Sequence, residues 1–228
     1  MDKIAFVFSG QGAQYPGMGK EIMEAYPAAK DVFERLEEKK PGLMRLCFDS
    51  TKEELMETRN TQPAMFAVET ATAAVLDSMG IKADAAAGFS LGEMAALVYS
   101  GVVTLEEGFE LVSERGRLMQ AEAEKHKAAM SAVLKLSAEQ VEALASKVEG
   151  VYPVNYNCPG QVVVSGTVEA LPGFEALVKE NGGRAMRLSV GGGFHSPFMK
   201  DAAALFGKEL EKHQFSTPSL PIYSNATG

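Results

Sequence analysis

The chain has 228 residues, of which 46% are hydrophobic and 23% charged, enough for one large domain or for a domain with an insertion. Its formal net charge of −8, without any run of Lys or Arg, argues against a nucleic-acid binder. The N-terminus shows no export signal and no run of about eighteen apolar residues occurs, so we expect a cytoplasmic protein without a membrane partner. Cys47 and Cys158 lie far apart without C-x-x-C spacing, which favours reduced thiols over a disulfide framework or a zinc site.

The first predicted element is a strand at residues 3–8, a continuous apolar run typical of a buried parallel strand. It leads into a glycine-rich loop at residues 9–14. The loop has neither the G-x-G-x-x-G pattern nor the P-loop lysine, so we expect an oxyanion or amide contact there instead of a nucleotide site. Helices are predicted over about residues 20–37, 51–56 and 61–79, and Gly80 ends the last of them.

Residues 85–97 predict a short strand, a sharp turn and a helix, with a G-x-S-x-G pattern at residues 88–92. This pattern is typical of a nucleophile elbow, because a serine on such a turn needs small neighbours two residues away on either side. The N–H groups at the start of the following helix can stabilise an oxyanion. We therefore predict that Ser90 is a nucleophile. The alternative is a buried serine in an ordinary strand-to-helix turn.

A long helix is predicted from Thr104, which forms a capping box with Glu107. One face of this helix is expected to be buried through Leu105, Phe109, Val112, Gly116 and Met119. Arg115 lies on a neighbouring face with Leu111 and Leu118, so its guanidinium is expected at the edge of a cavity.

From Ala128 the pattern changes to strand, helix, strand, strand, helix, strand. These elements are expected at residues 128–136, from Ser137, at 151–156, at 161–165, from about Glu169, and at 184–190. The sequence thus predicts an α/β protein in which a ferredoxin-like small subdomain, residues 126–189, is inserted into a larger body. That body, residues 1–125 and 190–228, is expected to be α/β-hydrolase-like with a parallel sheet.

Three histidines are candidates for the general base that Ser90 requires. His126 and His213 lie among charged residues, whereas His195 follows a glycine-rich segment that can hold an imidazole tightly. No Asp occurs between Asp84 and Asp201, which favours a Ser–His dyad, although a Glu in that interval remains an alternative third member. A loop histidine without chemical function is the other interpretation of His195.

These motifs resemble, along the whole chain, those of the malonyl-CoA:acyl-carrier-protein transacylases and the related acyltransferase domains of fatty-acid and polyketide synthases. Residues 8–14 resemble the family's F-P-G-Q-G-S-Q, 61–64 its T-Q-P-A, 88–93 its G-H-S-L-G-E, 115–120 its R-G-x-x-M-Q and 155–161 its N-x-N-S-P-G-Q, while His195 stands where the catalytic histidine does.

The resemblance implies ping-pong transfer of malonyl from malonyl-CoA through an acyl-Ser90 intermediate to acyl carrier protein, without a cofactor or a metal. His195 is then the general base and acid, and Arg115 pairs with the malonyl carboxylate. The backbone N–H groups of Gln11 and Leu91 are expected to form the oxyanion hole. The remaining substrate-binding positions that the resemblance implies are Asn157 and Phe194. A bulky Phe194 beside the base is also expected to favour malonyl over methylmalonyl.

The sequence departs from the family pattern at two places. Phe89 replaces the histidine before the nucleophile, which removes a polar group beside the site. Full-length members also continue past the strand predicted at residues 220–225 with a site glutamine and a final strand and helix, so we expect a fragment or an unusually short member. A serine hydrolase or thioesterase and an inactive carrier-docking fragment are therefore alternatives to the transacylase.

Overall fold

The computed structural model describes residues 3–228 and divides into two compact units. Unit 1 comprises Met1–Arg117 and Phe206–Gly228, and unit 2 comprises Leu118–Leu205. The boundaries expected from the sequence, residues 126 and 189, fall inside unit 2, and we keep them as a proposal for the extent of the inserted subdomain.

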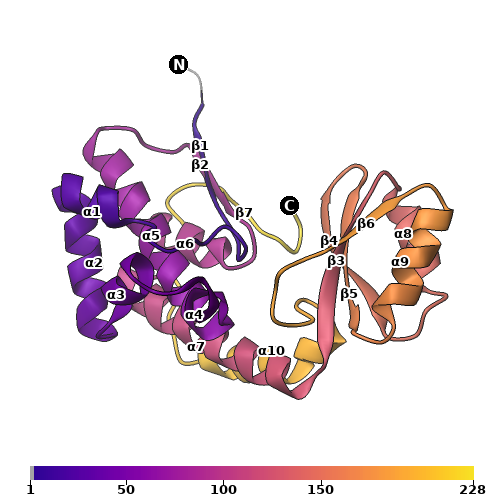
Figure 1. Cartoon of the computed structure of the whole chain (residues 1–228). Coiled ribbons are helices and arrows are strands. Elements are labelled where there is room, and N and C mark those ends of the chain that lie inside the picture. Colours follow the sequence, from indigo (N-terminus) through magenta and orange to yellow (C-terminus); the bar gives the residue numbers. More distant parts are fainter. Residues whose placement is uncertain (1–2) are drawn as a thin grey trace. The chain divides into compact units, whose positions relative to one another are not determined.

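Unit 1 contains a parallel sheet of β1 (Ala5–Phe8), β2 (Ala85–Gly88) and β7 (Ile222–Tyr223) in the order β1-β2-β7 (Figure 1). Phe8 pairs with Gly88, and Ala87 pairs with Tyr223. The three strands therefore end together, and the loops that follow them meet at one edge of the sheet. The predicted α/β class with a parallel sheet is confirmed, although β7 is shorter than the strand expected at residues 220–225.

The described part of unit 1 also contains several helices. They are α1 (Lys20–Ala25), α2 (Pro27–Lys39), α3 (Leu43–Phe48), α4 (Lys52–Met56), α5 (Thr58–Ser78) and α6 (Gly92–Tyr99), while α7 (Leu105–Lys125) and α10 (Lys200–Leu210) contribute residues to both units. The helix predicted over residues 20–37 is two helices, because Tyr26 before Pro27 is extended. α5 begins before the predicted Thr61 and contains Pro63, and α3 and α10 were not predicted. None of the helices in residues 3–228 has the length and apolar character needed to cross a bilayer.

Unit 2 is built on an antiparallel sheet of four strands in the order β4-β5-β3-β6. The strands are β3 (Ala128–Leu134), β4 (Val151–Cys158), β5 (Gln161–Thr167) and β6 (Arg184–Arg187), with α8 (Ala138–Ala145) and α9 (Leu171–Glu180) against one face (Figure 1) and the short 3-10 helix η1 (Pro197–Met199). This is the strand and helix order predicted for a ferredoxin-like unit. Ser137 and Gln140 form a capping box at the start of α8. The fully buried Phe174 packs with Val133 and Val164 in the core between sheet and helices.

Candidate active site

Ser90 lies on a tight turn between β2 and α6, with a left-handed φ of 54°. A Cβ at Gly88 would lie 2.0 Å from the backbone carbon of Gly92, and a Cβ at Gly92 would lie 2.5 Å from the carbonyl oxygens of Phe8 and Ser9. Both distances are too short for any side chain, because backbone atoms cannot move away cheaply. The steric interpretation of the G-x-S-x-G pattern therefore agrees with the packing of β1, β2 and α6.

The Arg115 guanidinium points at the hydroxyl of Ser90. Its Nη2 donates to Ser90 Oγ at 3.1 Å, and its Nη1 donates to Gln62 Oε1 at 2.9 Å. No carboxylate in residues 3–228 forms an ion pair with it. Burial lowers the pKa of Arg115 to about 10, against an opposing effect of Glu93, so the group remains charged at neutral pH. A cation held this way beside a serine hydroxyl forms a site for an anionic group.

Gln62 is a site residue that the sequence analysis did not identify. It is 1% exposed on α5 and accepts the hydrogen bond that orients Arg115. Gly116 lets α7 approach α5 closely, because a Cβ there would lie 3.0 Å from the Thr58 carbonyl and 3.2 Å from Gln62 Cβ. The T-Q-P-A motif includes this residue, but which side chain its glutamine contacts depends on how α5 and α7 pack.

The backbone N–H groups of Leu91 and Gln11 are the oxyanion donors that the sequence analysis predicted. Leu91 is fully buried at the N-terminus of α6, and Gln11 is in the loop after β1, where its Nε2 donates to Thr58 Oγ1 at 3.3 Å. Within residues 3–228, neither backbone N–H has a hydrogen-bond acceptor. Both groups are thus available to a ligand oxygen.

The other predicted site residues belong to unit 2. His195 is exposed and has a left-handed φ of 60°. Phe194 is only 4% exposed and packs in a cluster with Met119, Met130 and other apolar side chains, whereas Asn157 is exposed on β4. The structure therefore joins Ser90 and Arg115 by a hydrogen bond in unit 1, where Gln11 and Leu91 also lie, and places His195, Phe194 and Asn157 in unit 2.

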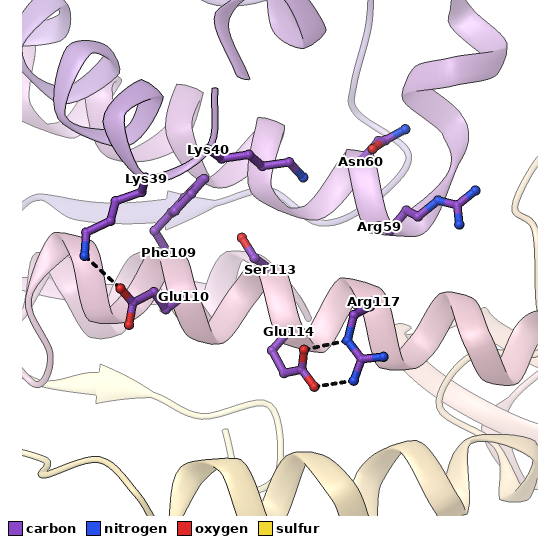
Figure 2. A pocket seen from close by; sticks show the side chains of 9 residues that line it. All are labelled: Lys39, Lys40, Arg59, Asn60, Phe109, Glu110, Ser113, Glu114 and Arg117. Carbon is purple, nitrogen blue, oxygen red and sulfur yellow. Dashed lines mark hydrogen bonds and ion pairs between the residues drawn. The ribbon is translucent and has the colours of Figure 1, made fainter. Parts of the chain in front are cut away.

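Figure 2 shows a different cavity of unit 1, with a volume of about 460 Å³, between the end of α2, the start of α5 and α7. Several cations line it, but Lys39 pairs with Glu110 and Arg117 pairs with Glu114. Neither Ser90 nor Arg115 lines this cavity. Its cations are largely neutralised already, so it is not the candidate active site. Among the described residues, no cluster of His, Cys, Asp and Glu is arranged to hold a metal ion.

Comparisons with known proteins agree with this geometry. The family model described as "Acyl transferase domain" matches residues 5–228. The malonyl CoA-acyl carrier protein transacylase of Bacillus subtilis (strain 168) is 40% identical over 233 residues, which cover 100% of this chain and 74% of that relative. The crystal structure of malonyl CoA-acyl carrier protein transacylase from Clostridium perfringens superposes with a TM-score of 0.93 at 38% identity, covering 98% of this chain and 72% of that one. A malonyl transacylase solved with its type II polyketide synthase acyl carrier protein also has a TM-score of 0.93, at 34% identity and 98% and 74% coverage.

Proposed function

The chain belongs to the acyl transferase domain family, and from this we propose that it moves a malonyl group from malonyl-CoA to the phosphopantetheine thiol of acyl carrier protein. This activity serves fatty-acid or polyketide synthesis, and we place it in the cytoplasm. The observation that carries the proposal is the Arg115 guanidinium, without an ion-pair partner among the described residues, that donates to Ser90 Oγ. A substrate with a thioester at one end and a carboxylate at the other fits a nucleophile and a cation that lie side by side.

In the proposed reaction, Ser90 Oγ attacks the thioester carbonyl of malonyl-CoA while His195 takes the hydroxyl proton. The backbone N–H groups of Gln11 and Leu91 donate to the oxyanion of the tetrahedral intermediate. The C–S bond then breaks, and the CoA sulfur leaves with the proton from His195. The carrier thiol attacks the malonyl-Ser90 ester in the same way and regenerates the serine.

Arg115 supplies the selectivity for malonyl. The planar guanidinium can donate two hydrogen bonds to a carboxylate. Its orientation is held by the hydrogen bond from Nη1 to Gln62 Oε1 at 2.9 Å. Acetyl has no group to pair with this charge, so the site favours malonyl by about 1.5 to 3 kcal/mol, or roughly one to two orders of magnitude. Phe194 and Asn157 remain proposed substrate contacts from unit 2.

The test is covalent adduct formation combined with a comparison of acyl donors. Malonyl-CoA should add one malonyl mass to the wild-type protein and none to Ser90→Ala. Arg115→Lys keeps the charge but loses the fork, and we expect it to lose malonyl transfer roughly 10- to 100-fold while acetyl transfer changes little. Arg117→Lys is the matched control, because Arg117 lies two residues further along the same helix and pairs with Glu114 on the surface (Figure 2).

An adduct on Ser90→Ala would remove the serine from the mechanism, and equal losses for malonyl-CoA and acetyl-CoA in folded Arg115→Lys would remove the carboxylate contact. Release of free malonate at the same rate with and without carrier protein would show a hydrolase instead. Carrier binding without any wild-type adduct would show a non-catalytic docking protein.

A further inference from the structure

Asn225 lies beside the nucleophile although 135 residues separate it from Ser90 in the sequence. β7 runs parallel to β2 with Tyr223 opposite Ala87, so the residues that follow the two strands continue side by side. Asn225 Oδ1 accepts a hydrogen bond from the Ser90 backbone N–H at 2.7 Å, and Asn225 Nδ2 donates to the Gly88 carbonyl oxygen. One carboxamide thus binds the last residue of β2 and the nucleophile itself.

The backbone of Asn225 is held in turn by the elbow helix. Its N–H donates to Glu93 Oε1 at 3.0 Å, and Glu93 lies in the first turn of α6. Asn225 therefore has three hydrogen bonds to the strand, turn and helix that make up the elbow. A non-glycine residue at a φ of 54° is held in a sparsely populated conformation, which persists only when its surroundings fix it.

From these three bonds we infer that Asn225 is a positioning residue for Ser90. It fixes the conformation in which Oγ projects from the turn, and it occupies the backbone N–H of Ser90 itself. Because that N–H is already bonded, a substrate oxyanion is directed to the N–H groups of Leu91 and Gln11. The kinetic part of this inference rests on the proposed acyl transfer, whereas the hydrogen-bond part concerns the folded protein alone.

Two substitutions separate the hydrogen bonds of the carboxamide from its bulk. Asn225→Ala removes both bonds. Asn225→Asp keeps an acceptor for the Ser90 N–H, but its ionised form places a second acceptor against the Gly88 carbonyl. Once protonated, the Asp carboxyl again has one acceptor and one donor and restores both bonds. Asn60→Ala is the matched control, because Asn60 in unit 1 also donates its amide to a backbone carbonyl, that of Glu54, at 2.9 Å.

The expected result is a loss of rate with intact binding. Single-turnover release of CoA from malonyl-CoA should be slower in Asn225→Ala by roughly 10- to 100-fold, as for other small displacements of a reacting group. The KM for malonyl-CoA should be unchanged, because Arg115 and Gln62, which are proposed to bind and orient the carboxylate contact, lie on α7 and α5 and not on the turn that Asn225 holds. The rate of Asn225→Asp relative to wild type should rise as pH falls toward about 4, where an ordinary Asp carboxyl takes up its proton, and Asn225→Ala should show no such rise. Asn60→Ala should react like wild type.

Hydrogen exchange of the backbone amides in the peptide containing Ser90 provides the readout that is independent of activity. Exchange there should accelerate in Asn225→Ala and stay unchanged in Asn60→Ala. A wild-type rate in Asn225→Ala, or a ratio for Asn225→Asp that does not change with pH, would overturn the positioning role. If the wild-type protein forms no adduct, the proposed function fails. Unchanged exchange in Asn225→Ala would separately refute the positioning role of Asn225.

Discussion

At the scale of single residues, burial shifts the pKa values of Arg115 and Glu69 in unit 1 with different consequences. Arg115 keeps its charge beside Ser90, as the site requires. Glu69 on α5 has its pKa raised to about 8 by burial, against the opposing effect of a hydrogen bond from Ser9 Oγ at 2.7 Å. The other residues that line the cavity of about 360 Å³ beside it carry no charge. Glu69 is therefore largely protonated at neutral pH, and its second oxygen, Oε2, is buried without a partner.

We predict that Glu69→Gln stabilises the protein more at high pH than at low pH. An unperturbed Glu carboxyl has a pKa of 4.5, so between that pH and about 8 the unfolded chain loses a proton that the folded chain retains. Wild-type stability therefore falls as pH rises through this window, and the loss is complete above the folded pKa. Glutamine keeps the acceptor for Ser9 and cannot ionise, so it should gain about 1 to 3 kcal/mol near pH 8 and little near pH 5. Thermal unfolding at the two pH values measures this.

The exposed Glu24→Gln in unit 1 is the control for the loss of one negative charge. It should change the melting temperature by a similar small amount at both pH values. A Glu69→Gln effect that is equally independent of pH would mean that Glu69 ionises normally in the folded protein.

At the scale of elements, α6 packs so closely against the end of β1 that Gly92 has no room for a side chain. We predict that Gly92→Ala destabilises the protein by about 1 to 3 kcal/mol or more, because the new Cβ would lie 2.5 Å from two carbonyl oxygens at the end of β1. The same displacement would move Gln11 and Leu91 apart, so acylation should fall even where the protein stays folded. Denaturant unfolding and adduct formation measure the two effects.

Gly207→Ala is the matched substitution for Gly92→Ala. Gly207 lies in α10 and a Cβ there meets no heavy atom within 4 Å. Alanine has the higher helix propensity, so this variant should be more stable than wild type by about 0.5 to 1 kcal/mol. Similar destabilisation by both substitutions would show that the effect at Gly92 is not steric.

The elements that the sequence predicted well are those with a local signal. The strand and helix around Ser90 follow from small residues and apolar runs, and the capping box at Ser137 marks the start of α8. The interruption between α1 and α2 at Tyr26 was not predicted, because its one sequence signal is the proline that follows Tyr26. Helix α10 has an amphipathic pattern that the glycine-rich segment before it obscured.

The same distinction explains which site residues were found. Ser90 stands in a motif whose chemistry can be interpreted from neighbouring residues, whereas the roles expected of Arg115 and Gln11 came from the family that their motifs resemble. The roles of Gln62 and Asn225 depend on contacts across 53 and 135 residues of chain, which the packing of α5 on α7 and the pairing of β7 with β2 create. Neither contact has a local pattern, so the sequence alone could not assign these residues.

At the scale of the whole molecule, the proposed functions are divided between the two units. Arg115, Gln62 and the oxyanion donors belong to unit 1, whereas His195 belongs to unit 2. The residue proposed to bind the malonyl carboxylate, Arg115, is hydrogen-bonded to Gln62 and Ser90 within unit 1. Substrate recognition and proton transfer should therefore be separable by substitution.

We predict that His195→Ala lowers the rate of Ser90 acylation by roughly 10²- to 10⁴-fold, the usual contribution of a general base, without weakening the binding of malonyl-CoA. Binding is best measured by calorimetry in the Ser90→Ala background, where no ester forms, with and without the second substitution. His126→Ala is the control, since His126 is also an exposed histidine of unit 2 and lies near Glu122. If both histidine variants acylate at the wild-type rate, another group accepts the serine proton. If His195→Ala weakens binding as much as it slows the reaction, His195 contributes to substrate binding and not to proton transfer alone. The proposal requires that His195→Ala, and not His126→Ala, slows acylation while the binding of malonyl-CoA is unchanged.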